Sequence, residues 1–234
     1  HMGGIPTNEF GEVQTAFQET VPGFFAIGEC ASASFHGFNR LGSNSILELI
    51  TMGKYAGERV LNYMEDADTD LPDEPAEATF SQFSRYVENR GRENIGKIRE
   101  EMKSLMTENV GVFRNEEKIV RAIEGLADLK KRAGNIPLSS ESLIMNQELV
   151  ERWELDNLLD LSMVIAHASL NRRESRGAHF REDFPERKDA FNHHTLASMT
   201  EFGKVNLGKR SVNQCIFEAK EKFYEKFGII ERRY

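Results

Sequence analysis

The chain has 234 residues and a formal net charge of −8 at pH 7, with 38 acidic side chains against 30 basic ones. This acidic balance argues against general affinity for nucleic acids or acidic membrane surfaces, which basic patches provide. The length suffices for one large domain or two small ones, and two cysteines cannot build a disulfide framework. No apolar run approaches the roughly 20 residues that cross a bilayer, and no signal peptide is recognisable.

The first 27 residues have the short apolar runs and turn residues of β structure. Residues 5–7 and 13–15 flank a turn that ends in glycine, which predicts a β-hairpin. A second turn over residues 21–23 leads into an apolar run over residues 24–27, which predicts a buried strand.

Two features at the chain start do not indicate a site. His1-Met2 is typical of an expression-tag remnant. Gly3-Gly4 is not a phosphate loop, because no helix follows it, and the chain contains no G-x-G-x-x-G or P-loop motif. The element that usually holds a dinucleotide pyrophosphate is therefore missing.

A loop of small and polar residues follows, and then a predicted helix from Ser45 to about Ala67. Ser45 and Glu48 have the spacing of a capping box, which marks a helix start. The unpaired amides and positive dipole at that end favour anionic or electron-rich ligand atoms.

Two charged side chains in this loop suit ligand binding. Arg40 lies five residues before Ser45 and offers a planar donor fork that matches a carboxylate. Glu29 follows the strand and can accept hydrogen bonds from ligand hydroxyls, as acids do for ribose in dinucleotide-binding folds. On pattern alone, the segment fits a ligand site and an ordinary loop equally well.

The chain from residue 78 to about 173 has a helical pattern, after an acidic linker with two prolines over residues 66–77. Three amphipathic helices are predicted from the apolar stripes Ile95, Ile98, Met102 and Leu105; Ile119, Ile123, Leu126 and Leu129; and Leu155, Leu159, Met163, Ala166 and Leu170. Short loops between them predict an antiparallel three-helix bundle, with Trp153 and the methionines in its core. No Glu-x-x-His pair lies on these helices, so we predict no metal site.

Residues 171–189 carry six basic and five acidic side chains. This near-balance predicts a lattice of ion pairs, a structural clasp, in preference to a nucleic-acid-binding arm or a catalytic site. Beyond it, His193-His194 lacks partner ligands for a metal. Residues 202–213 predict an extended segment, and residues 215–227 an amphipathic terminal helix.

Three motifs, in this order, resemble one enzyme family. They are Gly-Gly-Ile-Pro-Thr at residues 3–7, Gly-Glu-Cys and then His-Gly-Phe-Asn-Arg-Leu-Gly-Ser-Asn-Ser within residues 28–45, and Glu-Ser-Arg-Gly-Ala-His at residues 174–179. They closely resemble the flavoprotein subunit of succinate dehydrogenase and fumarate reductase. The resemblance spans nearly the whole chain, which looks like roughly the C-terminal two fifths of such a subunit.

The resemblance implies an α+β, mainly α fold in three parts. Residues 1–70 would be a truncated remnant of an FAD-binding domain, with a β-hairpin, a strand and a helix. Residues 78–190 would be a helical domain, the three-helix bundle, whose last stretch faces the flavin domain. Residues 191–234 would be a C-terminal extension with a terminal helix.

The family's residue roles fall on four positions of this chain. Arg40 matches the arginine that grips a substrate carboxylate. Glu29 matches the acid that hydrogen-bonds the flavin cofactor. Ser45 and Ile46 match the pair whose backbone amides contact the flavin ring. His36, in the same loop, receives no assigned role.

The implied activity is the interconversion of succinate and fumarate with FAD, with electrons passing to or from a quinone through an iron–sulfur subunit and a membrane anchor subunit. Such a subunit is cytoplasmic and peripheral to the inner membrane. Because much of the family's machinery lies upstream, we expect this chain alone to be inactive, to bind no FAD tightly and to form a homodimer through its uncovered edge. An L-aspartate oxidase-like flavoenzyme and a non-enzymatic helical docking module remain alternatives.

Overall fold

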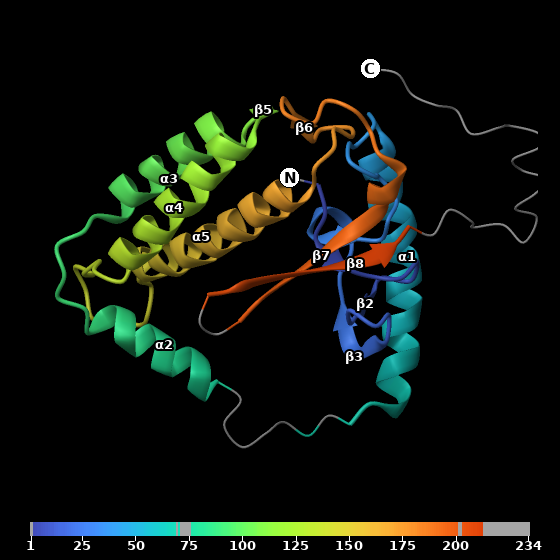
Figure 1. Cartoon of the computed structure of the whole chain (residues 1–234). Helices are drawn as coiled ribbons and strands as arrows, with labels where there is room; N and C mark the ends of the chain where they lie inside the picture. The colour runs from blue at the N-terminus through green and yellow to red at the C-terminus, as the bar shows by residue number, and fades with distance from the viewer. Residues whose placement is uncertain (1, 69, 71–75, 201–202, 213–234) are drawn as a thin grey trace, which may run out of the picture.

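The computed structural model describes residues 2–68, 70, 76–200 and 203–212, and the structural statements that follow concern these residues. Figure 1 shows a group of short strands beside one long helix, a bundle of helices on the opposite side, and a β-hairpin between the two. The fold is mainly helical, as the sequence predicts. The predicted terminal helix over residues 215–227 lies outside the described residues.

The N-terminal strands form two small sheets. They are β1 (Ile5–Pro6) paired in parallel with β4 (Ala31–Ser32), and β2 (Glu12–Gln14) paired antiparallel with β3 (Thr20–Phe25). The predicted hairpin is present at its turn, where an antiparallel bridge joins Thr7 to Val13 and the Asn8 amide donates to the Glu12 carbonyl oxygen, but beyond the turn its arms pair with β4 and β3 instead. The Thr15 hydroxyl accepts hydrogen bonds from the amides of residues 17 and 19, so the chain turns there and residues 21–23 continue β3.

The strand predicted over residues 24–27 is less buried than its composition indicates. Phe24 is 49% exposed, whereas Ala26 is buried and packs with Val13 and Ala31 in a small cluster. After β3, the chain forms a single 3-10 turn, η1 (Gly28–Cys30), before it reaches β4.

Helix α1 (Asn44–Asp66) starts one residue before the predicted position, and the predicted capping box is wrong. Ser43, with a φ of +67°, is the N-cap residue, and no side chain caps the helix. Glu48 is instead buried and accepts a hydrogen bond from His36 Nε2 at 2.6 Å. This contact with a distant loop takes the carboxylate that the capping box would need.

The bundle consists of three helices, as predicted: α3 (Ile95–Val110), α4 (Glu116–Ala133) and α5 (Gln147–Asn171). Each begins at an asparagine, residues 94, 115 and 146, whose side chain accepts the amide three residues on. The apolar stripes interlock, and among the fully buried side chains are Ile98, Ile119, Leu126 and Leu155.

Helix α2 (Glu77–Val87) lies beside the N-terminal part of α5 rather than inside the bundle (Figure 1). Phe83 of this helix packs edge-on against Trp153 at 5.7 Å between ring centroids. Trp153 remains 42% exposed, so its predicted core position is wrong, because its partner helix covers only one side of the ring.

The chain after α5 returns towards the N-terminal part. The elements there are β5 (Phe113–Arg114) paired in parallel with β6 (Phe180–Arg181), η2 (Asp189–Phe191), and the hairpin of β7 (His193–Met199) and β8 (Val205–Ser211). The hairpin confirms the extended segment predicted here. It contacts α5 and also the N-terminal part, where Arg210 donates to Gln14 and His194 bonds Ser34.

Candidate active site

The loop over residues 28–43 starts where the backbone approaches its neighbours closely. Gly28 has a φ of +72°, and a Cβ there would lie 2.3 Å from Leu49 Cδ2 of α1. A Cβ on Gly4 would lie 2.3 Å from the Cys30 carbonyl oxygen. Only glycine fits both positions, so the loop begins tightly against α1 and the first strand.

Arg40 and Glu29 lie together in this loop. Nη2 of Arg40 donates to the backbone carbonyl oxygen of Glu29 at 3.3 Å, which ties the end of the loop to its start. No acid within the described residues forms an ion pair with Arg40, and the Glu29 side chain is exposed. The guanidinium, four positions before Asn44, thus keeps most of its donor fork for a ligand beside the start of α1.

Ser45 and Ile46 occupy the first turn of α1. The amides of their neighbours Asn44 and Leu47 donate to the carbonyls of Leu41 and Ser43. Within the described chain, the amides of Ser45 and Ile46 donate no hydrogen bond, and Ile46 is 63% exposed. Two free amides at a positive dipole end fit an electron-rich group such as the edge of a flavin ring.

The pairing of His36 with Glu48 was missed by the sequence reasoning. Both side chains are at least nine-tenths buried, and they fix the middle of the loop to α1. His36 Nδ1 is buried without a partner in the described part of the chain. An acid on the buried side of the helix, facing a histidine-containing loop, is the sequence signal that could have predicted this pair.

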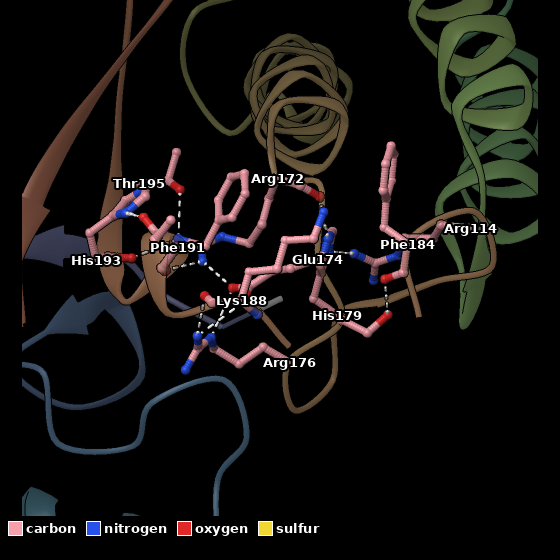
Figure 2. Close-up of polar contacts among 12 residues, drawn as sticks. Arg114, Arg172, Glu174, Arg176, His179, Phe184, Lys188, Phe191, His193 and Thr195 are labelled. Carbon is pink, nitrogen blue, oxygen red and sulfur yellow. Dashed lines mark hydrogen bonds and ion pairs between the residues drawn. The ribbon is translucent and has the colours of Figure 1, made fainter. Parts of the chain in front are cut away.

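A second polar cluster lies at the end of α5 (Figure 2). Glu174 is fully buried and accepts hydrogen bonds from Arg172 at 2.7 Å, Arg176 at 2.8 Å and the Lys188 amide at 2.9 Å. Burial by itself raises the pKa of Glu174, but these donors outweigh burial, so the pKa lies below its usual value. The predicted lattice of ion pairs is therefore present.

His179 belongs to the same cluster and is neutral at pH 7. Burial, together with the charges of Arg114, Arg172 and Arg181, lowers its pKa to about 4. Nδ1 accepts from Arg114 at 3.0 Å and Nε2 donates to the Arg172 carbonyl oxygen at 3.1 Å. With both nitrogens engaged, His179 acts as a structural group rather than a proton donor, consistent with the clasp interpretation.

The cluster reaches the Arg40 loop through Phe38. The Ala178 amide donates to the Phe38 carbonyl oxygen at 3.3 Å, and the Arg172 guanidinium lies 4.8 Å from the centroid of the Phe38 ring. The end of the helical part and the candidate site are thus in direct contact.

Two family models match the sequence. The C-terminal domain of fumarate reductase flavoproteins matches residues 99–224, and an FAD-binding domain matches residues 1–46, the stretch that includes Glu29, Arg40, Ser45 and Ile46. The chain belongs to the succinate dehydrogenase and fumarate reductase flavoprotein family. FAD is the cofactor of this family.

Curated relatives agree. The chain is 37% identical to the succinate dehydrogenase flavoprotein subunit of Rickettsia bellii over 219 residues, which are 91% of this chain and 37% of that protein. It is 36% identical to the fumarate reductase flavoprotein subunit of Haemophilus influenzae, over 86% of this chain and 33% of that protein. The chain therefore spans about a third of the length of these relatives.

Solved structures share the fold. An Escherichia coli quinol fumarate reductase chain superposes with a TM-score of 0.82 at 35% identity, covering 92% of this chain and 37% of that one. A Mycobacterium smegmatis Sdh1 chain superposes with a TM-score of 0.76 at 27% identity, covering 86% of this chain and 34% of that one. An adenylylsulfate reductase from Archaeoglobus fulgidus, at 21% identity and a TM-score of 0.62, shares the fold alone.

Proposed function

We propose that this chain is the C-terminal portion of an FAD-dependent flavoprotein subunit that interconverts succinate and fumarate. The observation that carries the proposal is Arg40, whose guanidinium is anchored to Glu29 by one bond and has no acidic partner within the described residues. A cation with free planar donors matches a substrate carboxylate. Its charge would also stabilise the negative charge that develops on a dicarboxylate during reaction.

The neighbouring residues fit the cofactor. Ser45 and Ile46 offer free amides at the start of α1, and the exposed Glu29 carboxylate can accept hydrogen bonds from FAD hydroxyls. When bound, FAD supplies the hydride chemistry, and the chain positions and polarises the substrate. Arg40 lies close enough in sequence to these residues to hold a substrate beside the flavin, as hydride transfer requires.

The division into parts follows from the same proposal. Residues 1–70 would belong to the FAD-binding domain, residues 78–190 would form the helical domain, and residues 191–234 would form an extension. Only residues 1–46 match the FAD-binding model, and no pyrophosphate-binding loop occurs in the chain. We therefore expect this chain alone to be inactive and to purify without stoichiometric flavin, which an absorption spectrum checks.

The similar structures suggest the partners. They include a quinol-fumarate reductase with menaquinol molecules and a Mycobacterium smegmatis Sdh1 complex. By analogy, the subunit would pass electrons to or from a quinone through an iron–sulfur subunit and a membrane anchor subunit, and would lie peripheral to the membrane. No helix among the described residues is long and apolar enough to cross a membrane. The comparisons give no support to the expected homodimer.

The test is steady-state kinetics of the FAD-loaded subunit that contains this chain, with succinate and L-aspartate as rival substrates. We expect succinate turnover, with Arg40→Gln lowering kcat/KM at least about 100-fold because the carboxylate partner is lost. The matched control is Arg59→Gln. It removes an exposed arginine whose guanidinium lies 4.2 Å from the ring centroid of the half-buried Phe10, and we expect kcat/KM to stay unchanged. Turnover of L-aspartate alone would favour the oxidase alternative.

A non-enzymatic docking role predicts a different result. The subunit would then hold the iron–sulfur partner in a pull-down at low and moderate salt, yet would turn over neither substrate. Loss of succinate turnover without loss of bound FAD in Arg40→Gln excludes that outcome.

A further inference from the structure

The Arg40 loop touches the helical part at Phe38, two positions before Arg40. The Phe38 carbonyl oxygen accepts from the Ala178 amide at 3.3 Å, which attaches the loop's main chain to the turn after α5. Two residues of chain span at most about 7 Å, so the backbone of Arg40 must follow the position of Phe38.

The side chain of Phe38 is held from one face. The Arg172 guanidinium lies 4.8 Å from its ring centroid, in a cation–π arrangement. Arg172 is only 3% exposed, and it donates to Glu174, to the carbonyls of Phe191 and His193, and to the Thr195 hydroxyl (Figure 2). Because Nη1 and Nη2 together donate to four acceptors, this guanidinium is held in place.

The close approach of the Gly177 backbone to Phe38 also limits how the loop can move. Gly177 has a φ of +56°, and a Cβ there would lie 2.6 Å from Phe38 Cβ. Such a contact admits glycine alone, so the turn and the Phe38 backbone pack without a gap. On the other side, His36 is fixed to Glu48 of α1, which leaves little freedom between residues 36 and 38.

We propose that Phe38 is a positioning residue that transmits the geometry of the buried Arg172–Glu174 cluster to the guanidinium of Arg40. The helical part then sets where the substrate carboxylate is held, without touching the substrate. This inference rests on the proposed function, since it assigns Arg40 the carboxylate.

The test uses Phe38→Leu in the FAD-loaded subunit that contains this chain. Leucine keeps most of the apolar volume but removes the aromatic ring, so the loop loses its cation–π contact with Arg172. We expect KM for succinate and Kd for malonate to rise about tenfold, with kcat within about threefold, and with flavin content and Tm unchanged. Phe38→Tyr keeps the ring face and restores values near those of the unaltered protein.

The matched control is Phe184→Leu, which removes a ring from the same cluster. Phe184 faces Arg181 and Lys188, 5.1 and 5.0 Å from its centroid. We expect its KM to equal that of the unaltered protein. A KM within twofold of normal in Phe38→Leu, or an equal rise in Phe184→Leu, overturns the inference while the proposed function stands. If the unaltered protein neither oxidises succinate nor binds malonate, the proposed function itself fails and takes this inference with it.

Discussion

Helix α1 and the helices of the bundle both carry apolar faces, but these faces differ in how far they are buried. In the bundle, Ile98 and Leu126 are fully buried, because α3, α4 and α5 cover one another's apolar stripes. On α1, Ile46, Leu47 and Ile50 are 63%, 57% and 70% exposed. Periodicity therefore predicts a helix and its apolar face, but the covering partner decides what that face contributes to stability.

The difference separates helices that cover one another's apolar faces from a helix whose apolar face is exposed within the described residues. An apolar face of this size on α1 is typical of an interface rather than of a free surface. It supports the proposal that further chain of an FAD-binding domain covers α1 in the whole subunit. Substitutions at buried groups of the helical part should therefore cost more stability than substitutions on the exposed face of α1.

The largest expected effect is at the buried cluster. Glu174→Gln removes the charge that Arg172 and Arg176 share, and it leaves the buried Arg172 and the half-buried Arg176 without a counter-ion among the described residues. We expect the free energy of unfolding to fall by about 3–5 kcal/mol in urea denaturation. The control is Glu182→Gln, whose side chain is 43% exposed and pairs with Lys118; this change should lower the free energy of unfolding by less than about 1 kcal/mol. Equal losses in the two variants would contradict the burial argument.

A matched pair of leucines tests the comparison itself. Leu126→Ala opens a cavity in the bundle and should cost about 3 kcal/mol of unfolding free energy. Leu47→Ala removes a side chain that is 57% exposed and should cost less than about 0.5 kcal/mol in this chain. A large loss in Leu47→Ala would mean that α1 is covered by something already present, such as a second copy of the chain.

The pH dependence should report the neutral His179. Its folded pKa of about 4 lies below the unfolded value of 6.5, so the unfolded chain binds the proton first and stability falls as pH drops below 6.5. Between pH 7 and 5, this group alone should remove about 2 kcal/mol. Urea denaturation at both pH values should therefore show that the free energy of unfolding falls less between pH 7 and 5 in His179→Gln than in the unaltered chain, whatever the stability of each at pH 7. Equal drops would indicate that His179 is not held neutral.

The smallest effect concerns helix caps. The Asn94 side chain accepts the Lys97 amide at 3.0 Å, so Asn94→Ala should cost about 1 kcal/mol. Ser45 caps nothing in α1, and Ser45→Ala should stay within about 0.3 kcal/mol in the same denaturation experiment. A loss of 1 kcal/mol or so in Ser45→Ala would restore the capping box that the sequence predicts.

The sequence predicts most of the bundle and the composition of the clasp, because those depend on local periodicity and on charges close together in the chain. It fails where a distant group competes for a side chain. Glu48 is taken from the predicted capping box by His36, and Trp153 is covered on one side only by Phe83. The cation–π contact of Phe38 with Arg172 joins residues more than 130 positions apart, which no local pattern encodes.

The proposed function depends on Arg40 holding a substrate carboxylate. The most direct measurement is a titration of the FAD-loaded subunit with malonate, followed by the change in the flavin absorption spectrum. We predict saturable binding in the unaltered protein and a Kd at least about 100-fold higher in Arg40→Gln, with the flavin content unchanged. A Kd for Arg40→Gln within threefold of normal would contradict the claim.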